Sequence, residues 1–455
     1  METEAAAVAA LPDDVLAAVL GRLPPRCIAA SRRVCQAWRD LVDGRRLLVP
    51  HLLPHSVRGF FVNYVDHGRP HFFARPAATA GRRRIDGKFR YVRPVHTNAW
   101  YVVADHCNGL VLYRDVDHDE LYACNPTTRR WVCLPPLAVD EKRKRRVFLV
   151  FDPTVSRHYQ VLMAPLEPAE KKPQKKPAAA GDTEADDGAW RSMEWPPSRW
   201  TWHIFSSRTG RWRERVFVRE GEAAGMVADL MMDSMRYHWQ PRWRYAAYWQ
   251  GALYLHCRGE YVSRLSLSTD TYQIIKSPID RAECYNNVWS FIGRLQKGVY
   301  FVAIHRRRLR VWILNELHRR MEWVLKHDRV LKPDDWWKVV LDGDYFQIQN
   351  DGPWILDDYY NKKAKRNVEW SSDDDDIIDT AEGNNDEEEY VYPHTFHVLG
   401  FHPYKEVIFL TALNVAVAYH LDSSKVQFLG ILKPSEWNHG VYDSFVYTPC
   451  IRPAA

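Results

Sequence analysis

The stretch NGLVLYRDVDHDELYACNPTTRRW, residues 108–131, contains the pattern that decides the fold. Two short apolar runs, 110–113 and 121–124, are separated by polar residues, and a turn rich in Asn, Pro and Thr then leads to Trp131. Short apolar runs bounded by turn residues are typical of antiparallel β-strands. We therefore expect two strands joined by a turn, and a further, outer strand that begins at the aromatic residue.

A polar turn followed by an aromatic residue recurs along the chain. Clear copies are 206–212 and 266–272, and looser copies are 314–323 and 421–428. Apart from one long gap, the copies lie very roughly 40–60 residues apart, which is the spacing of four-stranded propeller blades. The chain is thus predicted to be mainly β, with a β-propeller-like domain of six to eight blades. Residues 444–447 are predicted to join the first blade and close the ring.

Size and composition agree with a large folded domain. The chain has 455 residues, of which 46% are hydrophobic, and a formal net charge of +6 that is strongly local. No apolar run reaches the roughly 18 residues that a membrane span needs, and the N-terminus lacks the basic start of a signal peptide. The eight cysteines have no regular spacing. We expect free thiols and a location in the cytoplasm, the nucleus or both.

A second pattern lies at residues 11–41, LPDDVLAAVLGRLPPRCIAASRRVCQAWRDL, and follows an Ala-rich tail at 1–10 that we expect to be disordered. Helical spacing and the Pro24-Pro25 break predict three short helices, the first beginning at Pro12 and the third running through Val34, Trp38 and Leu41. Helices this short cannot bury all of their apolar side chains among themselves. We therefore expect apolar surface that a partner covers.

Leu11-Pro12, the apolar spacing of the first helix and the run VCQAWR at 34–39 resemble an F-box. The resemblance implies a module at 11–50 that binds the Skp1 subunit of cullin-RING ubiquitin ligases. The residues that it implies for this role, packed partly against Skp1 and partly against one another, are Leu11, Pro12, Val15, Leu16, Leu20, Ile28, Val34 and Trp38.

Residues 51–455 are predicted to form one domain, and most of residues 100–330 within it resembles the F-box-associated, kelch- or propeller-like domain of plant F-box proteins. The resemblance rests on NPTTRRW at 125–131 with LPP at 134–136, FDP at 151–153 with YQV at 159–161, GALY at 251–254 and RVWILN at 310–315. Two inserts, a Pro/Lys/Ala-rich one at 167–189 and an acidic one at 371–389, are expected to be disordered because neither can bury a core.

Motifs for chemistry are missing from the sequence. It contains no Walker-type phosphate loop, no GxSxG nucleophile motif and no CxxC pair, so we predict no catalytic residues, no cofactor and no metal site. His51 and His55 are interpreted as surface histidines of a linker, and His394 and His397 as strand residues.

The main hypothesis is a non-catalytic substrate adaptor of an SCF ubiquitin ligase, linked to cullin through Skp1. Loop tryptophans are candidate anchors for an unknown target protein: Trp195, Trp239 and Trp243. Two alternatives remain open, a Skp1-binding scaffold that delivers no substrate and a propeller enzyme or carbohydrate binder with a helical cap. Basic residues beside aromatics do not favour nucleic acid, since blade tryptophans usually pack in the core. Residues 142–146 are either a nuclear import signal or a solvated loop.

Overall fold

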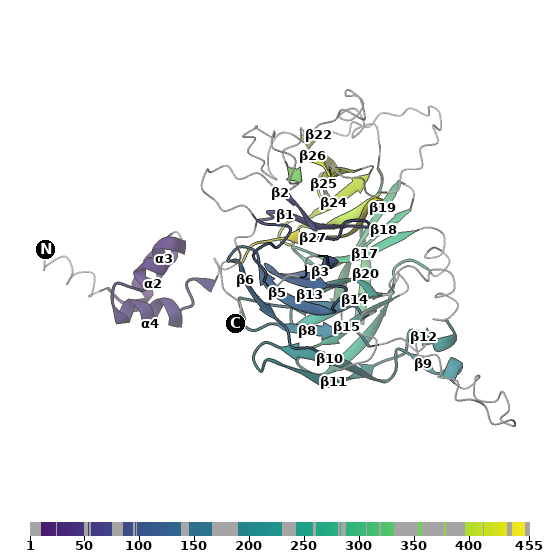
Figure 1. Ribbon diagram of the computed structural model, residues 1–455, viewed down its shortest axis with the longest axis horizontal. Helices are drawn as coiled ribbons and strands as arrows, with labels where there is room; N and C mark the ends of the chain where they lie inside the picture. Colours follow the sequence, from purple (N-terminus) through teal and green to yellow (C-terminus); the bar gives the residue numbers. More distant parts are fainter. Residues whose placement is uncertain are drawn as a thin grey trace, which may run out of the picture.

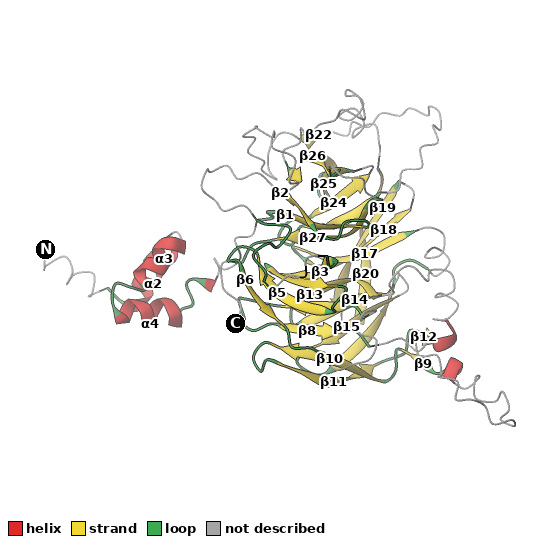
Figure 2. Cartoon of the chain, viewed as in Figure 1, coloured by secondary structure: helices red, strands yellow, loops and turns green. Residues whose placement is uncertain are grey.

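The structure, a computed structural model, is mainly β, with three short helices near the N-terminus (Figures 1 and 2). The predicted fold class, a small helical module followed by a β-propeller-like domain, is confirmed. The structure describes residues 11–23, 25–49, 53, 56–74, 85–93, 96, 98–137, 145–165, 190–229, 243–257, 261–280, 283, 288–305, 307–317, 320–331, 354–356, 377–378, 396–412, 414–434 and 439–450.

Two further expectations concern membranes and thiols. None of the helices in the described ranges is long and apolar enough to cross a membrane. The cysteines within these ranges are all free, as the irregular spacing predicted.

Three helices form the N-terminal module: α2 (Asp13–Gly21), α3 (Pro25–Ser31) and α4 (Gln36–Gly44). Asp13 and Asp14 lie in the first turn of α2, where carboxylates stabilise the positive end of the helix dipole. The predicted starts of two helices need correction. Pro12 is the residue before α2 rather than its first residue, and Cys35, in extended backbone, precedes α4. Val34 therefore lies in the turn before α4 and not inside the helix.

Apart from β9, β12 and β22, the strands of the described ranges form six units of four strands each, which we call blades 1 to 6 in chain order. Blade 1 contains β27 (Val441–Tyr447), β1 (Gly59–Tyr64), β2 (His71–Ala74) and β21 (Ile355–Leu356). Blade 2 contains β3 (Tyr101–Cys107), β4 (Leu110–Asp115), β5 (Glu120–Asn125) and β6 (Arg130–Cys133). Blade 3 contains β7 (Val147–Val150), β8 (Gln160–Met163), β10 (Arg199–Ser206) and β11 (Arg211–Glu220).

Blade 4 contains β13 (Trp243–Trp249), β14 (Ala252–Cys257), β15 (Tyr261–Ser266) and β16 (Thr271–Lys276). Blade 5 contains β17 (Trp289–Leu295), β18 (Gly298–His305), β19 (Arg308–Leu317) and β20 (Arg320–Val330). Blade 6 contains β23 (His397–Phe401), β24 (Val407–Ala412), β25 (Val415–His420) and β26 (Lys425–Ile431). Blades 3 and 4 also share a short parallel pairing between β11 and β16.

One strand of each blade lies innermost in the ring. These strands are β27, β3, β7, β13, β17 and β23, and residues from all six line a single cavity. The cavity therefore lies on the axis of the ring, and we call it the axial cavity. The prediction of six to eight blades included the number found in the described part of the chain.

Blade 1 is built from two distant parts of the chain. β27 pairs antiparallel with β1, with Phe61 opposite Phe445 and Gly59 opposite Tyr447. This pairing confirms the predicted ring closure by residues 444–447. Successive side chains of a strand point to opposite faces of the sheet. Accordingly, Phe60 contacts Phe409 of blade 6 at 4.8 Å between ring centroids, whereas Phe61 packs on the other face.

The turn at residues 125–128 gives a further link between the two ends of the β domain. The side-chain oxygen of Asn125 accepts hydrogen bonds from the backbone N–H groups of Thr127 and Thr128, at 3.1 and 3.2 Å. Its side-chain nitrogen donates to the carbonyl of Cys450 at 3.1 Å. One asparagine thus shapes the turn and fastens the segment that follows β27 to blade 2.

The aromatic residues after the polar turns lie near the start of outer strands, close to the predicted position. Trp131, Trp212, Tyr272 and Trp323 lie in β6, β11, β16 and β20. The indole of Trp212 donates to the carbonyl of Pro135 at 2.8 Å, and the indole of Trp323 donates to the carbonyl of Lys276 at 2.9 Å. Each acceptor lies at or just after the outer strand of the preceding blade, so these bonds join neighbouring blades.

Most of the predicted tail and of the two predicted inserts lies outside the residues that the structure describes. Residues 1–10 and 167–189 lie outside the described residues. Within the acidic stretch 371–389 only β22 (Ile377–Ile378) is described, and it pairs with Gln427 and Val426 of β26. These two isoleucines are apolar residues within an acidic run, so part of the stretch adds an edge strand rather than staying wholly unstructured.

Gly109 and Gly251 allow a test of how strongly the C-terminal segment is fastened. Both have positive φ, +86° and +80°, and both follow an inner strand. A Cβ at Gly109 would lie 2.4 Å from the backbone nitrogen of Cys450, whereas nothing lies within 4 Å at Gly251. We expect Gly109→Ala to destabilise the protein by about 1–3 kcal/mol more than Gly251→Ala, because only the former also clashes.

Thermal and urea unfolding of the two variants measure this difference. The strain of a left-handed backbone is common to both, so it cancels in the comparison. Equal losses of stability would show that the contact between Gly109 and Cys450 contributes nothing to closure.

Candidate functional site

The helical module has an exposed apolar face. Leu11, Val15 and Val19 recur every four residues along α2 and the residue pair before it, and they are 40%, 46% and 50% exposed. Val34, in the turn before α4, is 65% exposed. We call these four residues the exposed apolar set. Apolar side chains gathered on so small a module are typical of a surface that another protein covers.

Other residues of the predicted binding set form the core of the module. Leu16, Leu20 and Ile28 are buried and pack with Leu41 and Val42. Pro12 is exposed and Trp38 is half-buried against this core. The predicted set therefore divides into residues that hold the helices together and residues available to a partner. Spacing alone reveals which positions are apolar, but not which side of a helix faces its neighbours.

Two exposed ion pairs link the helices to one another. Arg32, after α3, contacts Asp43 of α4 at 2.7 Å, and Arg45, after α4, pairs with Asp14 in the first turn of α2. These pairs are exposed, so each contributes only about 0–1 kcal/mol. Their effect is to orient α2, and with it the exposed apolar set.

Arg46 and Leu53 link the module to the β domain. The Arg46 guanidinium donates a hydrogen bond to the carbonyl of Thr154 in the loop between β7 and β8. Leu53 is buried beside Cys107 and Cys450, in the core of blades 2 and 3. Figure 1 shows the three helices projecting from the side of the β domain. The exposed apolar set is therefore held away from the propeller blades.

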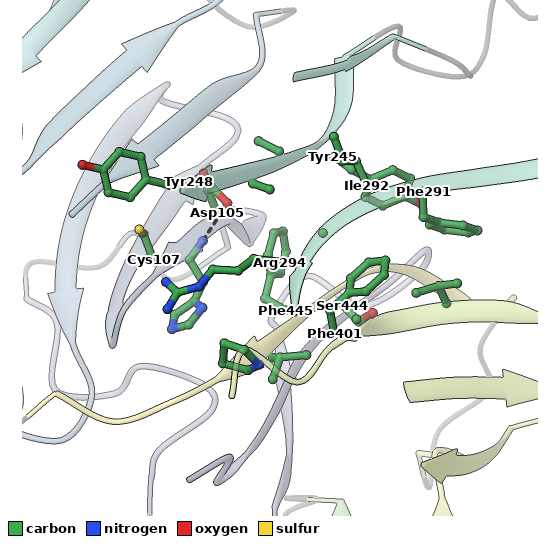
Figure 3. A pocket seen from close by; sticks show the side chains of 18 of the residues that line it. Asp105, Cys107, Tyr245, Tyr248, Phe291, Ile292, Arg294, Phe401, Ser444 and Phe445 are labelled. Atoms are coloured by element: carbon green, nitrogen blue, oxygen red, sulfur yellow. Dashed lines mark hydrogen bonds between the residues drawn. The ribbon is translucent and has the colours of Figure 1, made fainter. Parts of the chain in front are cut away.

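The axial cavity is the second candidate site. It has a volume of about 180 Å³, and Figure 3 shows Asp105, Cys107 and Arg294 grouped on one side of it. Phe291, Ile292 and Phe401 belong to an apolar part of its wall. Sequence reasoning missed this cavity because its lining comes from six strands that are far apart in the chain.

Ionisable side chains in and beside the cavity lose their charge in two ways, by pairing with an opposite charge or by a pKa shift that burial causes. Arg146 forms an ion pair with Asp443 of β27 at 3.0 Å. Burial raises the pKa of Asp105 to about 7, against hydrogen bonds from the backbone N–H groups of Leu149 and His106 that favour its charged form. Burial lowers the pKa of His106 to about 3, so its imidazole is neutral at physiological pH.

The predicted target-binding tryptophans occupy other places than expected. Trp195 lies in β9 (Glu194–Trp195), which pairs with β12 (Gly225–Met226), and not in a loop. It is 6% exposed and packs edge-on against Trp200, so little of its ring is available to a second protein. Trp243 is the first residue of β13, also not a loop position. Trp239 lies outside the described residues, and the binding role of Trp239 and Trp243 stays a prediction.

The basic run at 142–146 is only partly described. Arg145 is buried, and Arg146 is paired with Asp443, as described above. Residues 142–144 lie outside the described residues. The run therefore does not present five solvated basic side chains, because Arg145 is buried and Arg146 forms an ion pair.

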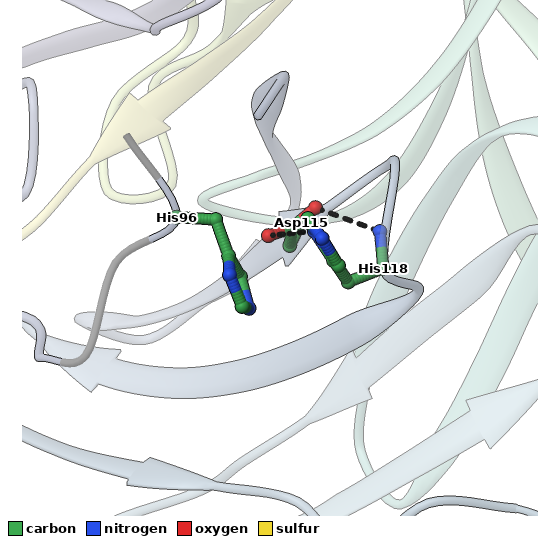
Figure 4. Close-up of side chains that lie close together, drawn as sticks. All are labelled: His96, Asp115 and His118. Carbon is green, nitrogen blue, oxygen red and sulfur yellow. Dashed lines mark hydrogen bonds and ion pairs between the residues drawn. The ribbon is translucent and has the colours of Figure 1, made fainter. Parts of the chain in front are cut away.

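Figure 4 shows a group that the sequence did not reveal, His96, Asp115 and His118, whose potential ligand atoms lie within 4.8 Å of one another. Asp115 is fully buried. Burial alone would raise its pKa, but hydrogen bonds from His118 and Tyr101 outweigh this effect and lower the pKa. The Asp115–x–x–His118 spacing was the available signal.

The geometry of this group does not favour one shared metal ion. The imidazoles of His96 and His118 stack, with centroids 3.7 Å apart and planes 18° from parallel. A ligating nitrogen directs its lone pair within the ring plane, at about 2.0–2.1 Å for zinc. One ion cannot lie in two nearly parallel planes at this separation. Among the predicted histidines, His397 lies in β23 as expected, and His51, His55 and His394 lie outside the described residues.

Comparison with known proteins identifies the helical module. Residues 8–48 match the family described as F-box-like. An F-box/kelch-repeat protein of Arabidopsis thaliana is 33% identical over 135 residues, which cover 28% of this chain and 30% of that protein. F-box only protein 17 of Rattus norvegicus is 50% identical over 44 residues, covering 10% of this chain and 18% of that protein. The chain thus spans less than a third of the length of these relatives.

Solved structures resemble the chain only distantly. The structure of YCF48 bound to D1 peptide covers 87% of this chain and 91% of its own, with a TM-score of 0.33 and 7% identity. AztD from Citrobacter koseri covers 76% of this chain and 74% of its own, with a TM-score of 0.27 and 6% identity.

The N-terminal module is therefore an F-box-like domain, joined to a propeller-like β domain. The chain thus combines a match to the F-box-like family with a propeller-like β domain, and it is similar over part of its length to an F-box/kelch-repeat protein of Arabidopsis thaliana.

Asp105 should give the stability a distinct pH dependence. A carboxyl whose pKa is raised by folding stabilises the folded state while it is protonated, and this contribution is lost as the pH rises through about 7. Asp105→Asn removes the titration but also one hydrogen-bond acceptor, so the variant should be less stable overall. Between pH 6 and 8 the wild type should lose about 1 kcal/mol relative to the variant.

Urea unfolding of both proteins at pH 6, 7 and 8 measures how the difference between their unfolding free energies changes with pH. Parallel loss of stability in the two proteins would contradict the assignment of the titration to Asp105.

Proposed function

We propose that this protein is a substrate-recognition subunit of an SCF-type ubiquitin ligase. Its F-box-like domain binds a Skp1-family protein, which links it to cullin, and its β domain holds a target protein. The observation that carries the proposal is the exposed apolar set on a module that matches the F-box-like family. The Arabidopsis and rat relatives, both named as F-box proteins, support the same kind of partner.

The subunit makes and breaks no bonds itself. By holding a target near a charged ubiquitin-conjugating enzyme, it raises the effective concentration of the target's lysines at the reacting centre. The projecting position of the helices suits this role, because a partner can cover the exposed apolar set without meeting the blades.

The same proposal assigns the protein to the cytoplasm, the nucleus or both, with proteasomal degradation of the target as the outcome. The free cysteines of the described residues are consistent with a reducing compartment.

Binding to a purified Skp1-family protein tests the first half of the proposal. The double substitution Val15→Asp with Val34→Asp places charges on the exposed apolar set without entering the core. We expect a loss of affinity of about 100-fold or more, because each carboxylate would be desolvated in the interface. Thermal unfolding should change little, since both side chains are exposed.

Val155→Asp is the matched control, because Val155 is 74% exposed in a turn of the β domain. It should bind the Skp1-family protein as the wild type does. If the double variant also retains full affinity, the exposed apolar set is not the docking surface and the proposal fails.

Deletion of residues 11–43 separates a substrate adaptor from a scaffold. The truncated protein keeps the β domain but cannot join the ligase, so a target should accumulate on it in cells. Quantitative mass spectrometry compares the proteins captured by the full chain and by the truncated form. No difference between the two captures would favour a scaffold that delivers nothing.

A further inference from the structure

Arg294 is an inward-facing cation without a carboxylate partner among the described residues. It is the penultimate residue of β17 and lines the axial cavity. Two other shielded arginines in the β domain do have such partners, at 2.5 Å in Arg114–Asp119 and 3.0 Å in Arg146–Asp443. A guanidinium without a counter-charge inside a protein is a ready site for an anion.

The surroundings hold the guanidinium in place without neutralising it. It lies over the ring of Trp249 at 5.0 Å and faces Tyr404 at 5.9 Å. Among the described residues, its hydrogen-bond contact is a long one, 3.5 Å from Nη1 to the side-chain oxygen of Asn108, and its buried Nε has no acceptor there. Trp249 ends β13, and Asn108 follows β3. Three chain segments therefore converge on one cation and leave most of its N–H donors available.

The charges around Arg294 indicate a single negative charge on the ligand. Arg146 and Asp443 neutralise each other, and His106 is uncharged, as described above. The Cys107 thiol is also neutral, because burial raises its pKa to about 12. Asp105, the remaining acidic group of the lining, is partly protonated near neutral pH. With Asp105 protonated, Arg294 supplies one net positive charge, which a monoanion would balance and a dianion such as phosphate would exceed.

The rest of the wall sets the shape of the ligand. Phe291, Ile292, Phe401 and Val446 supply apolar surface, and the cavity volume is about 180 Å³. Figure 3 shows Phe401 and Phe291 across the cavity from Cys107. A ligand with one carboxylate and a compact apolar body would place its charge at Arg294 and its body against these side chains. The planar guanidinium fork matches a carboxylate through two parallel hydrogen bonds.

We propose that the axial cavity binds a small monocarboxylate, with Arg294 as its anchor and the apolar wall as the seat of its body. The carboxylate belongs either to a free organic acid or to an acidic side chain of a bound protein. This inference goes beyond the SCF proposal and does not depend on Skp1 binding.

Calorimetric titration with benzoate, using benzamide as its neutral isostere, tests the proposal on the full-length protein. Benzoate should bind and benzamide should bind at least about tenfold more weakly, because a charge-assisted pair is lost. Arg294→Met, which keeps the length of the side chain but not its charge, should lower benzoate affinity by about tenfold or more. The benzoate affinity of Arg294→Lys should lie between those of the wild type and Arg294→Met, since lysine keeps the charge without the planar fork.

Arg308→Met is the matched control, because Arg308 is half exposed and paired with Asp328 on the outer strands of blade 5. It should bind benzoate as the wild type does. Where benzoate binds, wild-type affinity in Arg294→Met, or equal affinity for benzoate and benzamide, would overturn the proposal. If Arg294→Met does not fold, the Arg294→Lys series decides, and unchanged benzoate binding in that variant overturns it as well.

Two peptide probes distinguish the sources of the carboxylate. A blocked tripeptide with a central Glu is titrated beside its Gln counterpart. Binding of the Glu peptide alone assigns the site to an acidic side chain of a target, and binding of benzoate alone assigns it to a free acid. Binding of neither overturns the proposal. The Skp1-family protein is titrated into the same samples, so a failure of the cavity is distinguishable from a failure of the F-box-like domain.

Discussion

Everything in the β domain depends on the antiparallel pairing of β1 with β27. A ring of separate blades stays closed when one blade takes strands from both ends of the domain, as blade 1 does here. Here the closing strand is also the innermost strand of blade 1, so Ser444, Phe445 and Val446 line the axial cavity while their backbone holds the ring together. Asn125 and Gly109 of blade 2 then receive Cys450 and fasten the chain beyond β27. The cavity exists only because this closure exists.

The two candidate sites differ in exposure: one is an apolar surface and the other is a cavity. The F-box-like domain buries one side of each helix and leaves apolar side chains at the surface, where a large partner can cover them. The axial cavity encloses its functional groups, and its arginine is set by residues from three blades. A surface of the first kind suits a permanent protein partner, and a cavity of the second kind suits a small group whose charge must be matched.

Local pattern was sufficient to predict the outer strands, because a polar turn followed by an aromatic residue is a short-range signal. Trp131, Trp212, Tyr272 and Trp323 all begin or nearly begin such strands. The number of blades could not be fixed, since blade 1 takes its strands from three separated segments of the chain. Trp195 was misplaced because a two-residue strand carries almost no pattern. The axial cavity was invisible because Asp105, Arg294 and Val446 are brought together only by the closed ring.

The order of the strands along the chain has a consequence for synthesis. The F-box-like domain is complete once the first tenth of the chain has been translated, and its core uses no residue beyond Leu48. The ring cannot close until Val441–Tyr447 has left the ribosome. Under the proposed function, a message cut short before that point would encode a competitor, a product that still binds the proposed partner of the helices but carries an open β domain.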